Sequence, residues 1–581
     1  MKASLVKNSI INVCKAKKGT CLVLVIAIFG TVFASLVPPQ VLKLVIDKNL
    51  VPKVPQGLLA LALLYLGALL CIGLFDFTKE AVITVLGQTI TKEIRSEMMD
   101  KLETIPASYF SSQNAGEIVS RFTNDVDSIN AMFSSGIVGL AIDCFKIIGI
   151  VISIWLFSSQ LGLIVLVLLP VIFLISRLFQ KSMLKAQLEN RRVIGRVNNH
   201  IGESIKNMLM IKSNSKERYM EETYTKYLQQ NFKTIEKVNF FDSVFPPIIQ
   251  ITRALVIALI VVLSSKELHF LGITLGMVAA SIDLVSNLFI PIENLGMELQ
   301  NIQSSIAGSR RVDEFYREKE DDSKDTTITA KAILSQKTTA NLVFDHVSFH
   351  YDKGVEILKD ISLNIQDREK VTLVGRTGVG KSTLFKLVLG LLKPTKGSIT
   401  INGVDVYAIP NSEKRKLFGY VDQGFQIIVG TIGEQISLKD PSITKEQIER
   451  ALEVVDLTEY VHSLEKGIDT PVSDNSLFSQ GQKQLLAIAR AIVTDPPILL
   501  LDEITANLDS VTEAKLTAVL QKTSQEHTVL SISHRLSSLV DCDTMVILEK
   551  GKVKNSGSPQ KLMEEDDWFR SHRELEKLTG R

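Results

Sequence analysis

Six apolar stretches divide the first half of the chain, and charged stretches of unequal length separate them. The apolar stretches are residues 19–36, 54–75, 135–157, 161–175, 243–265 and 270–292. A helix needs roughly 20 apolar residues to cross the hydrocarbon core of a bilayer. Six such stretches in a row disfavour the alternative, which is a set of buried helices in a soluble core. The pattern therefore predicts a membrane α-helical bundle of six long transmembrane helices, surrounded by a lipid bilayer.

The connections between these stretches are alternately short and long. The two long ones, residues 79–127 and 177–242, are rich in Lys and Arg and have a helical composition. The first stretch is preceded by Lys2, Lys7, Lys15, Lys17 and Lys18. The positive-inside rule therefore places the N-terminus, both long connections and the second half of the chain in the cytoplasm of a multi-pass plasma-membrane protein. The first outer loop runs against this rule, because its lysines outnumber Asp47.

Four ionisable residues fall inside the predicted spans: Asp143, Lys146, Arg253 and Asp283. Such side chains are costly in lipid and usually face a bundle interior or an aqueous cavity. One hypothesis is that they line a substrate path. The other is that they pair with one another, or that Asp143 and Lys146 lie near a membrane face. Both hypotheses stay open at this point.

The second half of the chain, from residue 341, alternates short β-branched runs with helical patterns, as α/β domains do. One apolar run, residues 371–374, leads into a glycine-rich loop and then a helix, which is the setting of a P-loop. The loop consists of Gly375, Arg376, Thr377, Gly378, Val379, Gly380, Lys381, Ser382 and Thr383. Its glycines let the backbone approach a phosphate, Lys381 can reach that phosphate, and the Ser382 hydroxyl can bind Mg²⁺.

A second apolar run, residues 498–501, ends in two carboxylates. Asp502 at the strand end is suited to hold Mg²⁺ through water, and Glu503 can orient or deprotonate an attacking water. Placed after a P-loop, this pair indicates nucleotide hydrolysis.

Length and composition fit two domains and a linker. The 581 residues predict a transmembrane domain at 1–316, a charged linker at 317–340 and a nucleotide-binding domain at 341–581. The mean hydropathy of +0.20 is high for a soluble protein. The net charge of +2 implies no nucleic acid partner, and the five cysteines lack the spacing of a metal site.

In this order and spacing, the motifs resemble those of exporter-type ABC transporter half-units, such as multidrug, lipid and peptide exporters. The resemblance covers essentially the whole chain and implies an α/β P-loop ABC ATPase domain at 341–581 that uses ATP and Mg²⁺. It implies that Tyr351 stacks on adenine, that Gln423 contacts Mg²⁺ and signals to the membrane domain, and that His534 contacts the γ-phosphate. It also implies that Ser382 and Asp502 contact the metal and that Glu503 is catalytic. The signature motif would consist of Ser479, Gln480, Gly481 and Gln482, and the D-loop of residues 506–509. Coupling helices are expected near residues 113–122 and 203–213.

Taken singly, Tyr351 could be a surface aromatic, Gln423 a solvated loop residue and His534 a core histidine. Their order relative to the P-loop favours the functional roles.

The sequence departs from the family pattern at three places. Gln480 stands where a first signature glycine is usual, Asp422 replaces a common proline, and residues 470–474 lack the Glu and Gly often found there. Because family ATP sites combine Walker motifs of one chain with the signature of another, the altered signature suggests a heterodimer with a second half-transporter chain. A homodimer is the alternative.

The resemblance implies an ATP-hydrolysing exporter subunit that moves an unidentified substrate out across the cytoplasmic membrane by alternating access. Two alternatives are an importer of metal chelates built on the exporter fold, and an ATP-gated channel or transport regulator.

Overall fold

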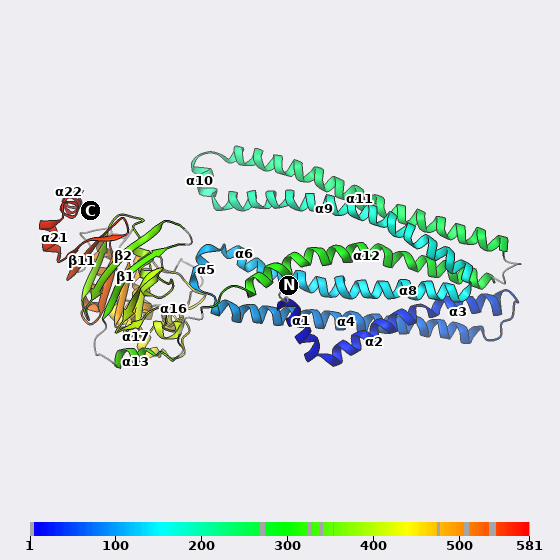
Figure 1. The fold of residues 1–581 in the computed structure, drawn as a ribbon, viewed down its shortest axis with the longest axis horizontal. Coiled ribbons are helices and arrows are strands. Elements are labelled where there is room, and N and C mark those ends of the chain that lie inside the picture. The colour runs from blue at the N-terminus through cyan, green and yellow to red at the C-terminus, as the bar shows by residue number, and fades with distance from the viewer. Residues whose placement is uncertain are drawn as a thin grey trace. The chain divides into compact units, whose positions relative to one another are not determined.

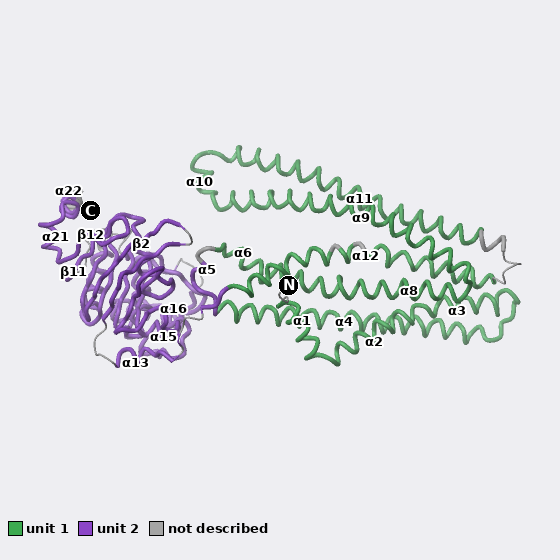
Figure 2. The backbone as a smooth tube through the Cα atoms, viewed as in Figure 1, with its two compact units in different colours: residues 1–103, 113–318 green, residues 104–112, 319–581 purple. Residues whose placement is uncertain are grey.

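A computed structural model describes residues 5–267, 274–321, 325, 327–335, 341–351, 354–472, 477–504, 510–533 and 542–579. The chain divides into two compact units, shown in Figure 2. The first consists of residues 1–103 and 113–318, and the second of residues 104–112 and 319–581.

The first unit is helical, and six stretches in the described part of the chain are long and apolar enough to cross a membrane. This confirms the predicted six-helix bundle. The stretches are Lys18–Leu50, Leu58–Thr104, Ala115–Phe157, Ser159–Lys206, Glu217–Val262 and Leu275–Tyr316. The helices that compose them are α2 (Lys18–Ser35), α3 (Val37–Val45), α4 (Leu58–Thr104), α6 (Ala115–Ser120), α7 (Val126–Ala131), α8 (Gly139–Phe157), α9 (Ser159–Lys206), α11 (Glu217–Glu267) and α12 (Leu275–Tyr316), with π-helical segments at Ile46–Leu50, Arg121–Asp125 and Met132–Val138.

Several helices run far beyond their apolar stretches. Helix α4 has 47 residues and α9 has 48, so each is about 70 Å long at a rise of about 1.5 Å per residue. The charged connections are therefore largely continuations of the spanning helices. Figure 1 shows α9 and α11 side by side, joined by the short helix α10 (Met208–Ser213). The first connection contains α5 (Ala107–Ser112) and α6.

The helical bundle has buried apolar cores but also exposes many apolar side chains. Its main core joins α8, α9, α11 and α12 through residues such as Ile154, Leu161 and Phe289. Along α4, by contrast, Leu59 is 75% exposed and Leu70 is 67% exposed. Exposed leucines in this number would be unfavourable in water but favourable against lipid chains.

The second unit is built on a six-stranded sheet with the order β12-β11-β3-β10-β9-β6. All neighbouring strands are parallel except β11 and β12. The strands are β3 (Lys370–Val374), β6 (Phe418–Val421), β9 (Ile498–Asp502), β10 (Thr528–Ile532), β11 (Thr544–Glu549) and β12 (Lys552–Gly557). Strand β9 is buried throughout, as expected for an inner strand of a parallel sheet.

A second, antiparallel sheet has the order β2-β1-β4-β5. It consists of β1 (Leu342–His350), β2 (Glu356–Ile365), β4 (Lys396–Ile401) and β5 (Val404–Asp405). One apolar core joins both sheets and helix α14 (Lys381–Val388) through residues such as Phe344, Leu373 and Leu384. A separate core lies among the helices α16 (Ile432–Ser437), α17 (Lys445–Val454), α18 (Thr458–His462), α19 (Gln480–Ile492) and α20 (Ser510–Thr523).

Candidate functional site

The parallel sheet brings four loops to one edge. The carboxyl ends of β3, β6, β9 and β10 lie at that edge, because parallel strands share their direction. Ile532 on β10 is opposite both Leu373 on β3 and Asp502 on β9, so the loops that follow begin at one level. These loops carry the glycine-rich segment, Gln423 and Glu503. His534 and residues 506–509 lie outside the described residues.

The backbone conformation of the glycine-rich loop requires glycine at three positions. Gly375, Gly378 and Gly380 have φ of 152°, 83° and 108°, which non-glycine residues rarely adopt. A Cβ on Gly375 would lie 2.4 Å from the carbonyl oxygen of Leu548. The loop exposes Arg376, Thr377 and Gly378 and half-exposes Val379. The loop is therefore an open backbone cradle, the shape that a phosphate group needs.

Lys381 begins helix α14 directly after this cradle, and its side chain folds back over it. Its Nζ donates to the carbonyl oxygens of Gly375 at 2.8 Å and Arg376 at 3.2 Å. Burial lowers the pKa of the Lys381 ammonium, whereas the carboxylates of Glu503 and Asp502 act in the opposite direction. A buried cation held only by neutral carbonyls is well placed to bind phosphate oxygens.

The two carboxylates face the cradle from the end of β9. The Ser382 hydroxyl is hydrogen-bonded to buried Asp502. Burial raises the pKa of the Asp502 carboxyl to about 6, the Ser382 hydrogen bond lowers it, and the neighbouring Glu503 carboxylate raises it. Carboxylate, hydroxyl and amide oxygens are ligands that Mg²⁺ accepts, so Asp502, Ser382 and Gln423 fit this ion chemically.

Glu503 is held by an unusual backbone and by Gln423. Its φ is 48°, in the left-handed region that a glutamate seldom occupies. Its backbone N–H donates to the carbonyl oxygen of Ile532 at 3.2 Å. Its Oε2 accepts a hydrogen bond from Nε2 of Gln423 at 3.1 Å. Strained residues of this kind cluster at functional sites.

Tyr351 directly follows strand β1 and lies beside the end of the glycine-rich loop. Its hydroxyl is 3.4 Å from Oγ1 of Thr383. Its ring packs edge-on against Phe349, with 4.9 Å between centroids, and remains 39% exposed. An exposed aromatic face beside a phosphate cradle is suited to stack on a nucleotide base.

The signature segment caps helix α19. Ser479 accepts from the backbone N–H of Gln482 at 3.2 Å, and the Gln482 side chain accepts from the N–H of Ser479 at 2.9 Å. This reciprocal pair is a capping box. Ser479 and Gln480 are exposed, whereas Gly481 is buried. A Cβ on Gly481 would lie 2.2 Å from Cγ2 of Thr512, so the chain needs this glycine for its own packing.

Three residues that the sequence reading had not assigned connect this helix and strand β6 to the Gln423 loop. Asp422 accepts from the Tyr420 hydroxyl at 3.2 Å and from the Gln423 N–H at 2.9 Å, contacts that a proline could not make. Buried Gln484 donates to the Gln423 carbonyl at 3.1 Å.

The third residue is Arg490, which donates to the carbonyls of Gln435 and Gln426 and lies 4.3 Å from the centre of the Phe425 ring. Burial lowers the pKa of its guanidinium to about 10. The detectable signal in the sequence was that Gln484 and Arg490 are the two polar residues of the otherwise apolar segment 484–492.

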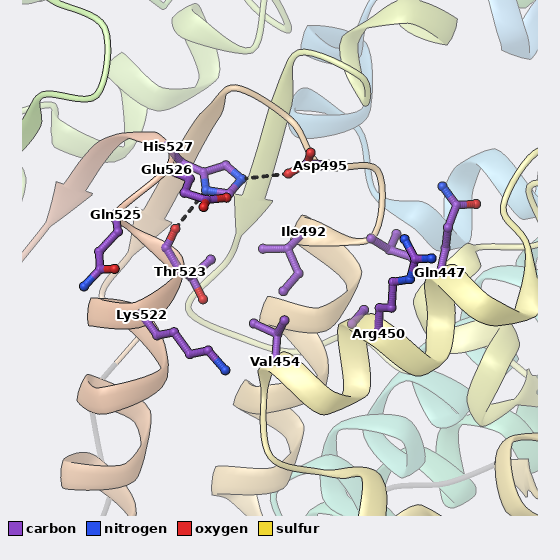
Figure 3. Close-up of a pocket in the computed structure, with 12 residues that line it drawn as sticks. Gln447, Arg450, Val454, Ile492, Asp495, Lys522, Thr523, Gln525, Glu526 and His527 are labelled. Carbon is purple, nitrogen blue, oxygen red and sulfur yellow. Dashed lines mark hydrogen bonds and ion pairs between the residues drawn. The ribbon is translucent and has the colours of Figure 1, made fainter.

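A cavity of about 610 Å³ lies elsewhere in the second unit, among α17, α19 and the end of α20. Figure 3 shows buried His527 in its wall, with Nε2 3.3 Å from Asp495 and Nδ1 2.8 Å from the carbonyl of Thr523. None of the predicted nucleotide-binding residues lines this cavity.

Comparisons with known proteins agree with this architecture. Residues 21–291 match the family described as the ABC transporter transmembrane region, and residues 358–506 match the family described as ABC transporter. The chain is 29% identical over 546 residues to the ABC transporter ATP-binding protein exp8 of Streptococcus pneumoniae, covering 94% of this chain and 92% of the relative. It is 28% identical over 507 residues to a fatty acid ABC transporter ATP-binding/permease protein of Mycobacterium tuberculosis, covering 87% of this chain and 79% of the relative.

A third relative is the lactococcin-A transport/processing ATP-binding protein LcnC of Lactococcus lactis. It is 29% identical over 574 residues, which cover 97% of this chain and 78% of the relative. Among solved structures, a bacterial Atm1-family ABC exporter with ATP bound has the same fold. Its TM-score is 0.78 at 22% identity, over 95% of this chain and 96% of that chain.

Six spanning helices ahead of a P-loop ATPase domain, together with matches across both halves, settle the identity of the chain. It is an ATP-hydrolysing exporter subunit of the plasma membrane, with a cytoplasmic ATPase domain and the organisation of a half-transporter, a class of exporter that typically dimerises. The chain belongs to the ABC transporter family.

Proposed function

We propose that the residues gathered at the edge of the parallel sheet bind and hydrolyse ATP, and that this reaction drives export by alternating access. The observation that carries this proposal is the convergence of Lys381, Glu503 and Gln423. Lys381 lies over the phosphate cradle, and Gln423 donates to Glu503 at 3.1 Å. The segments that follow three separate strands thus supply a cation (Lys381), a general base (Glu503) and an amide that can respond to bound nucleotide (Gln423).

In this mechanism Lys381 transfers its hydrogen bonds from the carbonyls of Gly375 and Arg376 to phosphate oxygens. Tyr351 stacks on the adenine base and so orients the nucleotide with its phosphates in the glycine-rich loop. Glu503 then orients the attacking water and takes its proton. We assign the γ-phosphate contact to His534 from the family pattern alone.

Magnesium would be held by Ser382, Asp502 and Gln423, and when bound it would neutralise charge on the phosphate oxygens. The chain's own contribution is the orientation of these groups. Ser382 is hydrogen-bonded to Asp502, and the Gln423 amide lies beside Glu503. Release of the Gln423 side chain from Glu503 would link ATP binding to helix α19, because Gln484 donates to the backbone carbonyl of Gln423 and Asp422 accepts from its backbone N–H.

The exposed signature segment is proposed to close over the ATP site of a second half-transporter chain. Ser479 and the N-terminus of α19 can offer hydrogen bonds to a phosphate there. Gln480 adds a side chain at the point where the family usually has none. We therefore propose a heterodimer in which the partner's ATP site, closed by this signature, hydrolyses more slowly than the site built on Glu503.

Reconstitution in proteoliposomes tests both transport and assembly. With the ATPase domains facing the bath, ATP is expected to drive accumulation of a probe in the lumen, for at least one of a fluorescent fatty acid, an amphipathic peptide and ethidium. ATPase activity is expected to be low for this chain alone and to rise when a partner half-transporter chain is added.

The outcomes of this experiment separate the two claims. ATP-driven loss of probe from the lumen would indicate import, and flux without ATP consumption would indicate a channel. Either result contradicts the proposed exporter. Cooperative, high ATPase activity from a stable assembly of this chain alone would contradict only the heterodimer.

The signature glycine offers a second test. Gly481→Ala is expected to lower stability by about 1–3 kcal/mol, because its Cβ would overlap the Thr512 methyl group. Adding Thr512→Ser removes that methyl group and is expected to restore the melting temperature, but not the ATPase activity of the dimer, since the Cβ still obstructs the phosphate. Full recovery of ATPase activity in the double variant would show that Gly481 serves packing alone.

A further inference from the structure

A polar cavity of about 440 Å³ lies in the first unit among α4, α7, α8, α12 and the π-helical segment Met132–Val138. Two carboxylates, four amides and several hydroxyl groups line it, and the lining that the structure describes contains no Lys or Arg. The lining residues are Glu80, Ile83, Thr84, Gln88, Asn130, Ser134, Ser135, Gly139, Ile142, Asn294, Met297, Glu298 and Asn301. A polar cavity of this kind in a membrane bundle points to a ligand rather than to packing.

The cavity lies at the cytoplasmic end of the bundle by sequence position. Glu80 follows the second apolar stretch by five residues, and Glu298 follows the sixth stretch by six residues. Gly139 lies at the start of α8, near the beginning of the third stretch. A solute from the cytoplasm would therefore meet these groups before it reached the apolar part of the bundle.

Two neighbouring buried carboxyl groups lack enough hydrogen-bond partners here: Glu298, which lines the cavity, and Asp143, which contacts Glu298 but is not part of the lining. Glu298 is 7% exposed and Asp143 is 5% exposed. They are hydrogen-bonded to each other, and Asn294 is hydrogen-bonded to Asp143. One oxygen of each carboxyl group, Oδ2 of Asp143 and Oε2 of Glu298, has no hydrogen-bond partner. Buried polar atoms are nearly always satisfied, so two orphan oxygens in one place call for a partner.

The backbone makes room for these polar side chains. A Cβ on Gly139 would lie 2.4 Å from Oε1 of Glu298, and a Cβ on Gly87 would lie 2.2 Å from Oδ1 of Asn130. Gly139 and Gly87 therefore leave space for the side chains of Glu298 and Asn130 inside the bundle. An alanine at either position would overlap the side chain beside it.

Nearby cations do not balance the acidic groups. Lys79 and Lys146 both act on Asp143 electrostatically. The Nζ of Lys79, however, is bound to Asp76 at 2.8 Å and lies 3.5 Å from Glu80. Because a hydrogen bond between Asp143 and Glu298 needs a proton on one of them, three carboxylates share two ammonium groups, which leaves this region with one more negative than positive charge.

We propose that this cavity binds the cationic group of an organic cation, such as an ammonium or phosphonium centre, through Glu298, the member of the Asp143–Glu298 pair that lines it. Ile83, Ile142 and Met297 provide apolar contacts for the body of the same molecule. A metal ion suits the site less, because no group of three or more His, Cys, Asp or Glu residues that could hold one occurs in the described part of the chain. The proposal names a substrate class for the exporter and rests on the proposed function.

Two ions of equal size and opposite charge test it: tetraphenylphosphonium and tetraphenylborate. Binding of each to the full-length chain in nanodiscs is measured without nucleotide and corrected with empty nanodiscs. Glu298→Gln preserves the shape of the side chain but removes its charge. This variant is expected to weaken phosphonium binding by about tenfold, which corresponds to about 1.4 kcal/mol, and to leave borate binding unchanged or stronger.

Matched variants separate a charge effect from a folding effect. Gly139→Ala is expected to weaken phosphonium binding because it displaces the Glu298 carboxyl group. Gly136 lies three residues before Gly139, and a Cβ there would lie 2.8 Å from Cγ1 of Ile302 and would meet no carboxyl group. Gly136→Ala is therefore expected to leave binding unchanged. Asp283→Asn, on the same helix but outside the cavity lining, is expected to do the same.

Phosphonium affinity that survives in both Glu298→Gln and Gly139→Ala would overturn the proposal. Equal losses in the Gly136→Ala and Asp283→Asn controls would overturn it as well. Because binding is measured without ATP, absence of ATP-driven transport would contradict the proposed function and leave this binding result intact.

Discussion

Replacing Glu503 by Gln is expected to lower ATP hydrolysis by about 10²–10⁴-fold, the usual contribution of a positioned general base. The amide keeps the shape of the side chain and its contact with Gln423, which is 3.1 Å in the wild type. It cannot accept a proton from water. ATP binding should therefore persist, and ATP should remain trapped in the closed dimer. Hydrolysis is measured as phosphate release, and trapping as labelled ATP retained after gel filtration.

The matched control is Glu549→Gln, which removes an exposed carboxylate at the end of β11. Its ATPase activity should equal that of the wild type. Unchanged turnover in Glu503→Gln would mean that another group activates the water. Loss of both hydrolysis and ATP binding would place Glu503 in nucleotide binding and not in the chemical step.

Lys381→Met is expected to weaken ATP binding by about tenfold to a hundredfold, because charge-assisted hydrogen bonds contribute about 1.5–3 kcal/mol each. Methionine keeps the apolar stem that packs in the buried start of α14 and removes only the ammonium group. The carbonyls of Gly375 and Arg376 lose their donor as well, so a modest fall in melting temperature should accompany the loss. Binding is measured by equilibrium titration with a fluorescent ATP analogue.

Lys386→Met is the control for this variant, because Lys386 lies on the same helix with its side chain exposed. It should bind ATP as tightly as the wild type. If Lys381→Met retained full affinity, the cradle would bind phosphate through its backbone N–H groups alone, and the assigned role of Lys381 would be wrong.

The sequence alone predicted those features that depend on residues close together in the chain. The six spans follow from long apolar runs, and the P-loop follows from glycine spacing between a strand and a helix. The proximity of Gln423 and Glu503, which are 80 residues apart, was anticipated only through the family resemblance. It is a consequence of parallel strand order, which single-sequence patterns do not encode.

Contacts between distant helices could not be anticipated in the same way. The Gly481 backbone and the Thr512 methyl group meet because α19 packs on α20. Asp143 was identified as costly in a span, but its partner Glu298 is 155 residues away and lies outside the predicted apolar stretch. Such pairings depend on which faces of two helices meet, and the periodicity of either helix alone does not specify that.

The left-handed backbone at Glu503 has a consequence for the stability of this chain. A non-glycine residue in that conformation costs roughly 1–2 kcal/mol relative to its preferred conformations, and glycine at the same position would relieve most of it. Because the φ of Glu503 is 48°, a chain with glycine at this position would fold more stably and would lack the carboxylate that faces the phosphate cradle. Folding stability and ATP hydrolysis therefore favour different residues at this one position.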